Sequence, residues 1–284
     1  MVFKSGRQVP RCVKTAQVPD PERTEEPSPC SGKEHFLKKS QERIQEHKAV
    51  HLLLLIPVIL AALAAIAFFV YVSSYYRADA AAEKALVSDE TTVVSGTEYG
   101  WFFDGPSEDT AMVFYPGGKV EEKAYAPLLH RIAAEGMDVC LVKMPFRLAV
   151  LDKDAAKKVM DLYSYSKWYV GGHSLGGVMA ASYAAGHEDG LEGIILFAAY
   201  PTKKIPPDMT EILIVGSEDK VIRWDKIEES RQYAPGSFTE HIIEGGNHAQ
   251  FGSYGEQKGD GTALVSADIQ VEESVRIISE TLLR

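Results

Sequence analysis

An uncharged apolar run at residues 52–72, LLLLIPVILAALAAIAFFVYV, restricts most strongly how this chain can fold. As a helix that rises about 1.5 Å per residue, the run is long enough for the roughly 30 Å hydrocarbon core of a bilayer. A helix satisfies its own backbone polar groups, so lipid tolerates such a segment. Tyr71, Tyr75 and Tyr76 stand at its end, where aromatic rings favour the headgroup layer. The run predicts one N-terminal transmembrane helix over residues 51–73 and contact with the lipid bilayer through residues 52–72.

The run has two other interpretations, a buried core helix and a cleaved signal peptide. Core helices rarely stay uncharged for so long, and the apolar part of a signal peptide has about 7–15 residues. The small residues around Asp79 still leave cleavage after Ala80 open. Lys and Arg gather in residues 1–50, whereas the dozen residues after the run carry only Arg77 and Lys84. We therefore expect a single-pass protein of the cell membrane with a cytoplasmic N-terminus and an extracytoplasmic domain.

Composition divides the chain into four parts. Residues 1–50 include a stretch rich in Pro, Glu and Ser, which predicts a mostly disordered cytoplasmic tail. Residues 74–90 are expected to be a spacer between the membrane helix and one folded domain at residues 91–284. The formal net charge of −10 argues against nucleic acid as a partner. The three cysteines have no metal-ligand spacing, and we expect no metal.

Apolar and amphipathic segments alternate from about residue 91 onward. After a hairpin at 91–105, strands are expected at 110–118, 137–145, 167–174, 191–201, 210–219 and 238–248. Helices are expected at 122–136, at 153–163, from Leu175 onward, at 224–234 and at about 266–283. Continuously apolar strands that alternate with helices predict an α/β fold, a mostly parallel sheet with helices on both faces.

The serine in Gly172-His173-Ser174-Leu175-Gly176 is the candidate nucleophile. The motif G-x-S-x-G is weak alone, but here it follows a predicted strand and opens a predicted helix, as a nucleophile elbow requires. A serine hydroxyl needs a base, and the base needs an acid that orients it. Two later strands end near Asp219 and His248, in the chain order Ser, Asp, His. Glu218 is the alternative to Asp219.

The loop after the strand at 110–118 is expected to complete an oxyanion hole. One donor should be the backbone N–H of Leu175, directly after the nucleophile. The other should come from Gly118, with Lys119 as the alternative, because glycines at 117 and 118 let the backbone approach an oxyanion closely. An ordinary Pro-Gly turn is the competing interpretation of this loop.

Residues 110–284 resemble the α/β-hydrolase superfamily, in the compact branch near the dienelactone-hydrolase-like proteins. The resemblance rests on FYPGGKVEEKAYAPLLHRIAAEGMDVCLVKMPF, GGHSLGGVMAASYA, GSEDKVI and EGGNHAQFGSYG. It implies a Ser174–His248–Asp219 triad and hydrolysis of esters or related acyl groups without a cofactor. The chain departs from the pattern with Tyr115-Pro116 where many relatives have His-Gly, and with serine where dienelactone hydrolase has cysteine.

We therefore expect a membrane-anchored serine hydrolase that acts on small carboxylic esters. A peptidase or amidase with the same triad, or a non-catalytic binding protein with this fold, are the alternatives. The segment between the strand at 191–201 and Thr210 is too short for a large cap, so the site should be open, with residues 144–150 and 249–263 as its walls. The expected substrate contacts in and near these walls are Lys119, Phe146, Arg147, Gln250 and Phe251, with Arg147 suited to an anionic group.

Overall fold

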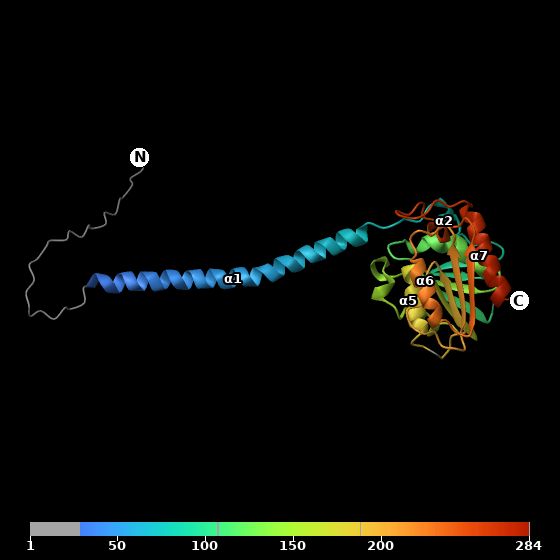
Figure 1. Ribbon diagram of the computed structural model, residues 1–284, viewed down its shortest axis with the longest axis horizontal. Coiled ribbons are helices and arrows are strands. Elements are labelled where there is room, and N and C mark those ends of the chain that lie inside the picture. Colours follow the sequence, from blue (N-terminus) through green and yellow to red (C-terminus); the bar gives the residue numbers. More distant parts are fainter. Residues whose placement is uncertain (1–28, 107, 188, 284) are drawn as a thin grey trace, which may run out of the picture. The chain divides into compact units, whose positions relative to one another are not determined.

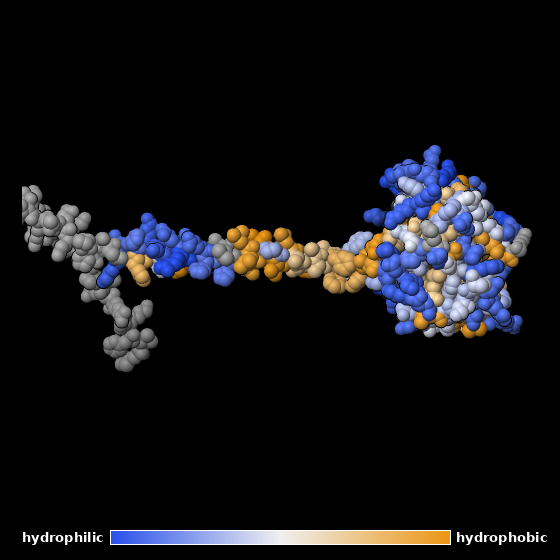
Figure 2. Space-filling model, turned by 90° about the horizontal axis from the view of Figure 1, so that it is seen from below, coloured by the Kyte–Doolittle hydropathy of each residue, from blue (hydrophilic) through white to orange (hydrophobic). Residues whose placement is uncertain are grey.

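The computed structural model describes residues 29–283, except residues 107 and 188, and the chain divides into the units Met1–Ile66 and Ala67–Arg284. Helix α1, Pro29–Ser73, contains the whole apolar run. Polar side chains gather along its N-terminal part and apolar ones along its C-terminal part (Figure 2). Within the described residues, the stretch Lys33–Ser73 is the one helix long and apolar enough to cross a membrane. The disorder predicted for residues 1–50 falls outside the described residues up to residue 28, and residues 29–50 belong to α1.

Eight strands of the second unit form one sheet in the order β1-β2-β4-β3-β5-β6-β7-β8. Their bounds are β1 Val93–Thr97, β2 Gly100–Asp104, β3 Thr110–Tyr115, β4 Asp138–Val142, β5 Lys167–His173, β6 Gly193–Phe197, β7 Thr210–Gly216 and β8 Ser237–Ile243. The pairs β1–β2 and β2–β4 are antiparallel, and the other five neighbouring pairs are parallel. The predicted edge hairpin and the mostly parallel sheet are both confirmed.

The helices cover both faces of this sheet. They are α2 Ala80–Lys84, α3 Ala126–Ala134, α4 Ala155–Met160, α5 Leu175–Ala184, α6 Trp224–Ser230 and α7 Ala267–Leu282. Helices α5 and α6 lie on one side of the sheet and α7 on the other, where α3 packs against it (Figure 1). Helix α3 ends just before Gly136, which has φ +101° and stops the helix. The strands between the two layers are buried almost throughout, as their continuous apolar runs predict.

Residues 74–90, predicted as a spacer, pack on the domain instead. Asp79 caps α2, because its Oδ1 accepts hydrogen bonds from the N–H groups of Ala81 and Ala82 at 2.9 and 3.1 Å. Ala82 is fully buried, and Asp89 Oδ2 lies 2.9 Å from Nε2 of His130 on α3. Small alanines allow this close packing, yet in the sequence they resemble a linker. The folded unit consequently begins before residue 91.

The register of the parallel strands brings several loop starts to one edge. Tyr115 pairs with Gly172, His173 with Phe197, and Gly216 with Ile243. The residues that follow β3, β5, β7 and β8 therefore lie at the same carboxyl edge of the sheet. In an open α/β sheet this edge is where ligands bind.

Candidate active site

Ser174 alone forms the turn between β5 and α5. Its backbone has φ +52° and ψ −125°, a conformation that non-glycine residues rarely adopt. The Ser174 N–H donates to the carbonyl of Phe197 at 2.9 Å, and its carbonyl accepts from the N–H of Val178 at 3.1 Å. The first hydrogen bond fixes the strained residue to the sheet, and the second fixes it to the helix. Backbone strain of this kind is characteristic of functional turns, and it predicts a role for the serine.

The two glycines that flank the motif are required by packing against the end of β3. A Cβ atom on Gly172 would lie 2.6 Å from the carbonyl oxygen of Tyr115. A Cβ atom on Gly176 would lie 2.2 Å from the same oxygen and 2.3 Å from that of Pro116. Only glycine therefore lets the elbow come this close to the loop that carries Gly118.

Asp219 and His248 form a buried pair at the same edge of the sheet. Asp219 Oδ2 lies 2.7 Å from Nδ1 of His248, and the two residues are 2% and 1% exposed. Asp219 Oδ1 accepts the N–H groups of Val221 and Ile222, each at 2.8 Å, which fixes the carboxylate. The neighbouring Glu218 makes no such contact with His248 within the described chain.

This contact sets the tautomer of a neutral His248. A carboxylate only accepts hydrogen bonds, so Nδ1 carries the proton and Nε2 is left with its lone pair. The Nε2 atom is buried and has no hydrogen-bond partner among the described residues. The ring lies 4.5 Å, centroid to centroid, from that of His173, which directly precedes the serine. The arrangement can supply a general base beside the elbow.

The loop after β3 leaves one N–H group for a further ligand. The N–H of Gly117 donates to the hydroxyl of Tyr125 at 3.0 Å, and the N–H of Lys119 donates to the carbonyl of Arg147 at 2.9 Å. The N–H of Gly118 has no partner within the described part of the chain. A Cβ atom on Gly118 would lie 2.8 Å from Cδ2 of Leu175, so the two expected oxyanion donors are close neighbours. Of the two residues expected for this role, the geometry favours Gly118 over Lys119.

A buried tyrosine ties this loop to the elbow, and the sequence gives little sign of it. The Tyr125 hydroxyl lies 2.8 Å from Nδ1 of His173, and both residues are almost fully buried. Because the Tyr125 oxygen accepts the N–H of Gly117, its own proton is available for His173. Burial lowers the pKa of His173 well below its ordinary value, so this ring stays neutral and accepts at Nδ1. In the sequence, Tyr125 appears only as one apolar position of a helical pattern.

The two cationic residues expected at the rim are stacked on tyrosines. The guanidinium carbon of Arg147 lies 3.4 Å from the ring centroid of Tyr75, and Lys119 Nζ lies 4.2 Å from that of Tyr71. Arg147 lies beside the Gly118 loop, because its carbonyl accepts the N–H of Lys119 at 2.9 Å. Their positive charges face the rings of Tyr71, near the end of α1, and Tyr75, just after it, and the sequence-based expectation of an anionic substrate contact did not include these rings.

The apolar and amide rim residues divide between surface and core. Phe146 is 46% exposed at the surface, and its role as a substrate contact stays a prediction. Phe251 has no exposed surface, and its ring packs on those of His173 and Phe197 at 5.8 and 5.6 Å. Phe251 is therefore not available as the substrate contact that was expected, and its ring packs against His173 instead. Gln250 is partly exposed, and its Oε1 is buried without a hydrogen-bond partner in the described chain.

Backbone strain is concentrated around this edge. Five described non-glycine residues have a positive φ, and four of them are Lys119, Phe146, Arg147 and Ser174. Each such residue costs of order 1–3 kcal/mol and persists only where its surroundings hold it. The clustering distinguishes this edge from the rest of the fold and supports its choice as the site.

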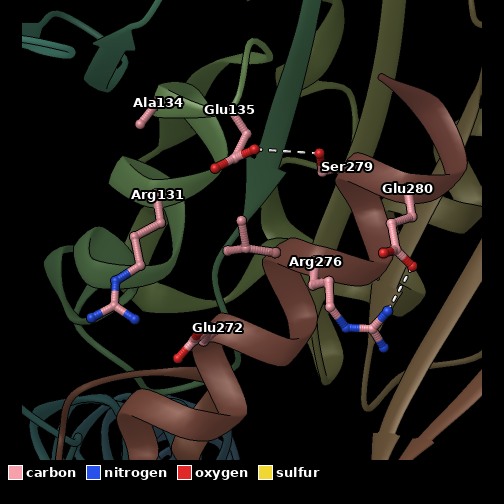
Figure 3. A pocket seen from close by; sticks show the side chains of 8 residues that line it. Arg131, Ala134, Glu135, Glu272, Arg276, Ser279 and Glu280 are labelled. Atoms are coloured by element: carbon pink, nitrogen blue, oxygen red, sulfur yellow. Dashed lines mark hydrogen bonds and ion pairs between the residues drawn. The ribbon is translucent and has the colours of Figure 1, made fainter. Parts of the chain in front are cut away.

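A surface pocket with a volume of about 350 Å³ lies elsewhere, between α3 and α7 (Figure 3). It is lined by Arg131, Ala134, Glu135, Glu272, Val275, Arg276, Ser279 and Glu280. Arg276 pairs with Glu280 at 2.6 Å, and Arg131 pairs with Asp268, outside the lining, at 2.7 Å. It contains none of the predicted site residues. Across the described residues, no group of three or more His, Cys, Asp or Glu side chains is placed to hold a metal ion.

Comparisons with known proteins agree with this architecture. The model of the alpha/beta hydrolase family matches residues 111–272, more than half of the chain. An epoxide hydrolase from Vigna radiata aligns with a TM-score of 0.51 and 8% identity, over 69% of this chain and 99% of that one. A predicted CIB-like hydrolase from Thermoplasma acidophilum aligns at 0.48 with 15% identity, over 66% of this chain and 99% of that one. The search of curated proteins found no match.

Proposed function

Because the chain belongs to the alpha/beta hydrolase family, we propose that it is a serine hydrolase that cleaves carboxylic esters, with Ser174 as nucleophile. His248 is the general base, and Asp219 holds it in the reactive tautomer. The observation that carries the proposal is the 2.7 Å contact between Asp219 and His248, both buried at the sheet edge that also carries the strained Ser174. The order and the roles are those of a Ser-His-Asp triad.

The proposed reaction has two halves. The Ser174 hydroxyl adds to the ester carbonyl while His248 Nε2 takes its proton, and the oxyanion accepts the N–H groups of Leu175 and Gly118. The alcohol then leaves with the proton from His248, and an acyl-enzyme remains on Ser174. Water adds to the acyl group through the same base, and collapse of this second intermediate releases the acid and restores the serine. No cofactor enters either half.

Helix α1 is the proposed membrane anchor, with its basic N-terminal side in the cytoplasm and the hydrolase domain outside. Its most apolar window has no buried residues, unlike a core helix. Three features argue against cleavage after Ala80: Asp79 caps α2, its N–H donates to Ser253 at 2.9 Å, and Tyr76 pairs with the loop at Val120. Cleavage would detach Tyr76 and Asp79 from the chain of the domain that they contact, so the anchor is proposed to stay attached.

The test is hydrolysis of p-nitrophenyl acetate and butyrate by the full-length protein in detergent. Ser174→Ala should lower kcat by at least about a thousandfold while the far-UV circular dichroism stays unchanged. Ser95→Ala, at an exposed serine on β1, is the matched control and should keep full activity. The rate should also fall on acidification, because a protonated His248 cannot accept the serine proton. Hydrolysis that survives Ser174→Ala would contradict the proposal.

A further inference from the structure

The last residues of the apolar run and those that follow it form a strap on the proposed oxyanion loop. We use the term strap for residues 68–79. The Tyr76 N–H donates to the carbonyl of Lys119 at 2.8 Å, and the Glu121 N–H donates to the carbonyl of Tyr76 at 2.9 Å. Together they make a parallel bridge between Tyr76 and Val120. The loop that carries Gly118 is thus paired, through its backbone, to the end of the proposed anchor.

The strap also holds the loop that follows His248. The Asp79 N–H donates to the carbonyl of Ser253 at 2.9 Å, and the Tyr76 hydroxyl accepts the N–H of Lys258 at 3.1 Å. The Tyr76 ring packs on that of Tyr254, with centroids 5.5 Å apart. One short segment therefore binds the two loops that carry the oxyanion donor and the base.

The short link between the end of α1 and Tyr76 limits how far the site can lie from the bilayer. Helix α1 ends at Ser73, and Tyr76 already pairs with the oxyanion loop. Three residues span at most about 10 Å when fully extended. The headgroup region on each side of the hydrocarbon core is about 5–8 Å thick. With the apolar run in a bilayer, the oxyanion loop lies in the headgroup layer or just above it.

The rim of the site is apolar where it meets this layer. Phe146 packs edge-on against Phe68 and Phe69 of the strap, with ring centroids 5.3 and 6.2 Å apart. Val150 and Leu151, on the same loop after β4, are 50% and 51% exposed. These exposed apolar side chains lie next to the proposed membrane span, and the bilayer interface is the apolar surface that they would meet there. The tyrosines stacked on Lys119 and Arg147 belong to the residue types that favour this depth.

We propose that this rim inserts into the bilayer interface and that the site takes amphiphilic esters from the membrane, whose long chains stay in the bilayer while the ester group reaches Ser174. This inference rests on the proposed hydrolase function and on the proposed anchor. In this fold, which has no lid among the described residues, the bilayer then supplies the apolar surroundings that a lid would otherwise provide. The inference differs from the sequence-based expectation of small carboxylic esters.

A direct test of insertion does not need activity. Single tryptophans are introduced into the full-length protein in vesicles of phosphatidylcholine brominated either near the top of the acyl chains, for Phe146→Trp, or near their ends, for Leu60→Trp, and quenching is compared with the unsubstituted protein, which has three tryptophans. Phe146→Trp should be quenched, and Leu60→Trp, inside the apolar run, is the positive control. Val93→Trp is the negative control, because Val93 lies at the opposite edge of the sheet. Gly100, at one end of β2, pairs with Val142 at the catalytic edge, whereas Asp104, at the other end of β2, pairs with Val93.

The outcomes separate the claims. Quenching at Leu60→Trp without quenching at Phe146→Trp would overturn the interfacial rim and leave the anchor intact. Absence of quenching at Leu60→Trp would overturn the anchor and this inference together. Quenching at Phe146→Trp and Leu60→Trp, with none at Val93→Trp, supports the inference whether or not the protein is active.

The substrate class is tested by surface dilution. A long-chain ester with a chromogenic alcohol is held at one bulk concentration in vesicles, and inert phosphatidylcholine is added with the protein in the same bilayer. A tenfold lower mole fraction of ester should lower the rate about tenfold, as mass action in the bilayer requires. A rate that follows the bulk concentration would overturn the inference. Cleavage of p-nitrophenyl acetate beside no cleavage of the bilayer ester would also overturn it, whereas cleavage of neither would refute the proposed function itself.

Discussion

The Tyr125 hydroxyl connects the proposed oxyanion loop to the elbow, and we use it to predict the effect of Tyr125→Phe. The Tyr125 hydroxyl accepts the N–H of Gly117 at 3.0 Å and lies 2.8 Å from Nδ1 of His173. The substitution removes one oxygen atom and keeps the ring, so packing against Phe114 is retained. Two buried polar groups lose their partner.

A buried donor or acceptor without a partner costs about 1–3 kcal/mol. Two such groups give about 2–6 kcal/mol, and we expect about 2–4 kcal/mol because the desolvation of the hydroxyl itself is also removed. The Gly117 N–H would no longer be fixed, and the neighbouring Gly118 N–H would shift with it. A misplaced oxyanion donor should lower kcat by about tenfold to a hundredfold. Urea unfolding and ester hydrolysis measure the two effects separately.

Tyr115→Phe is the matched control. Its hydroxyl is equally buried and also makes two hydrogen bonds, to the carbonyl of Lys153 and from the N–H of Ala156, both at 2.8 Å. These partners lie outside the proposed site, so this variant should lose similar stability while kcat changes little. A loss below about 0.5 kcal/mol in Tyr125→Phe, or an equal fall of kcat in both variants, would refute the reasoning.

Three further predictions concern stability, packing and topology. Burial raises the pKa of Glu211 to about 8 from an ordinary 4.5, so between these values the folded chain holds a proton that the unfolded chain releases, and stability falls as pH rises. The difference in free energy of unfolding between Glu211→Gln and the unsubstituted protein should therefore shift in favour of the variant by up to about 4 kcal/mol from pH 5 to pH 8. A difference that does not change with pH would contradict this. Gly176→Ala should abolish activity and lower the melting temperature, since its Cβ would overlap two backbone oxygens, and a fully active variant would show that the elbow is looser than described. A protease outside intact cells should degrade the hydrolase domain and spare an epitope within residues 1–48; digestion of that epitope alone would reverse the proposed orientation.

The fold could be predicted largely from hydrophobic periodicity. Within the hydrolase domain, the continuously apolar runs expected as strands became strands of the sheet, because a strand buried on both faces leaves no polar position. The element ends were less accurate, as with β3, which ends at Tyr115 although a strand was expected to residue 118. Pro116 and the two glycines after it leave the sheet to form the loop of the site.

Parts of the site could not be predicted, because they depend on contacts between segments far apart in the chain. The choice between Gly118 and Lys119 depends on a carbonyl of Arg147 that accepts the Lys119 N–H. The alanine-rich segment with Ala82 has the composition of a linker, yet its small side chains let it pack closely on the domain. Phe251 follows the candidate base within a polar, glycine-rich stretch, and nothing in that pattern distinguishes a buried aromatic ring from one at the surface.

The central claim is that Ser174 is an activated nucleophile, and one measurement tests it most directly. The full-length protein is treated with a fluorophosphonate probe and digested, and the modified peptide is identified by mass spectrometry. We predict a single adduct on Ser174 that is lost in His248→Gln, because the serine then has no base. An unlabelled Ser174 in the folded protein, or an adduct on another residue, would contradict the assignment.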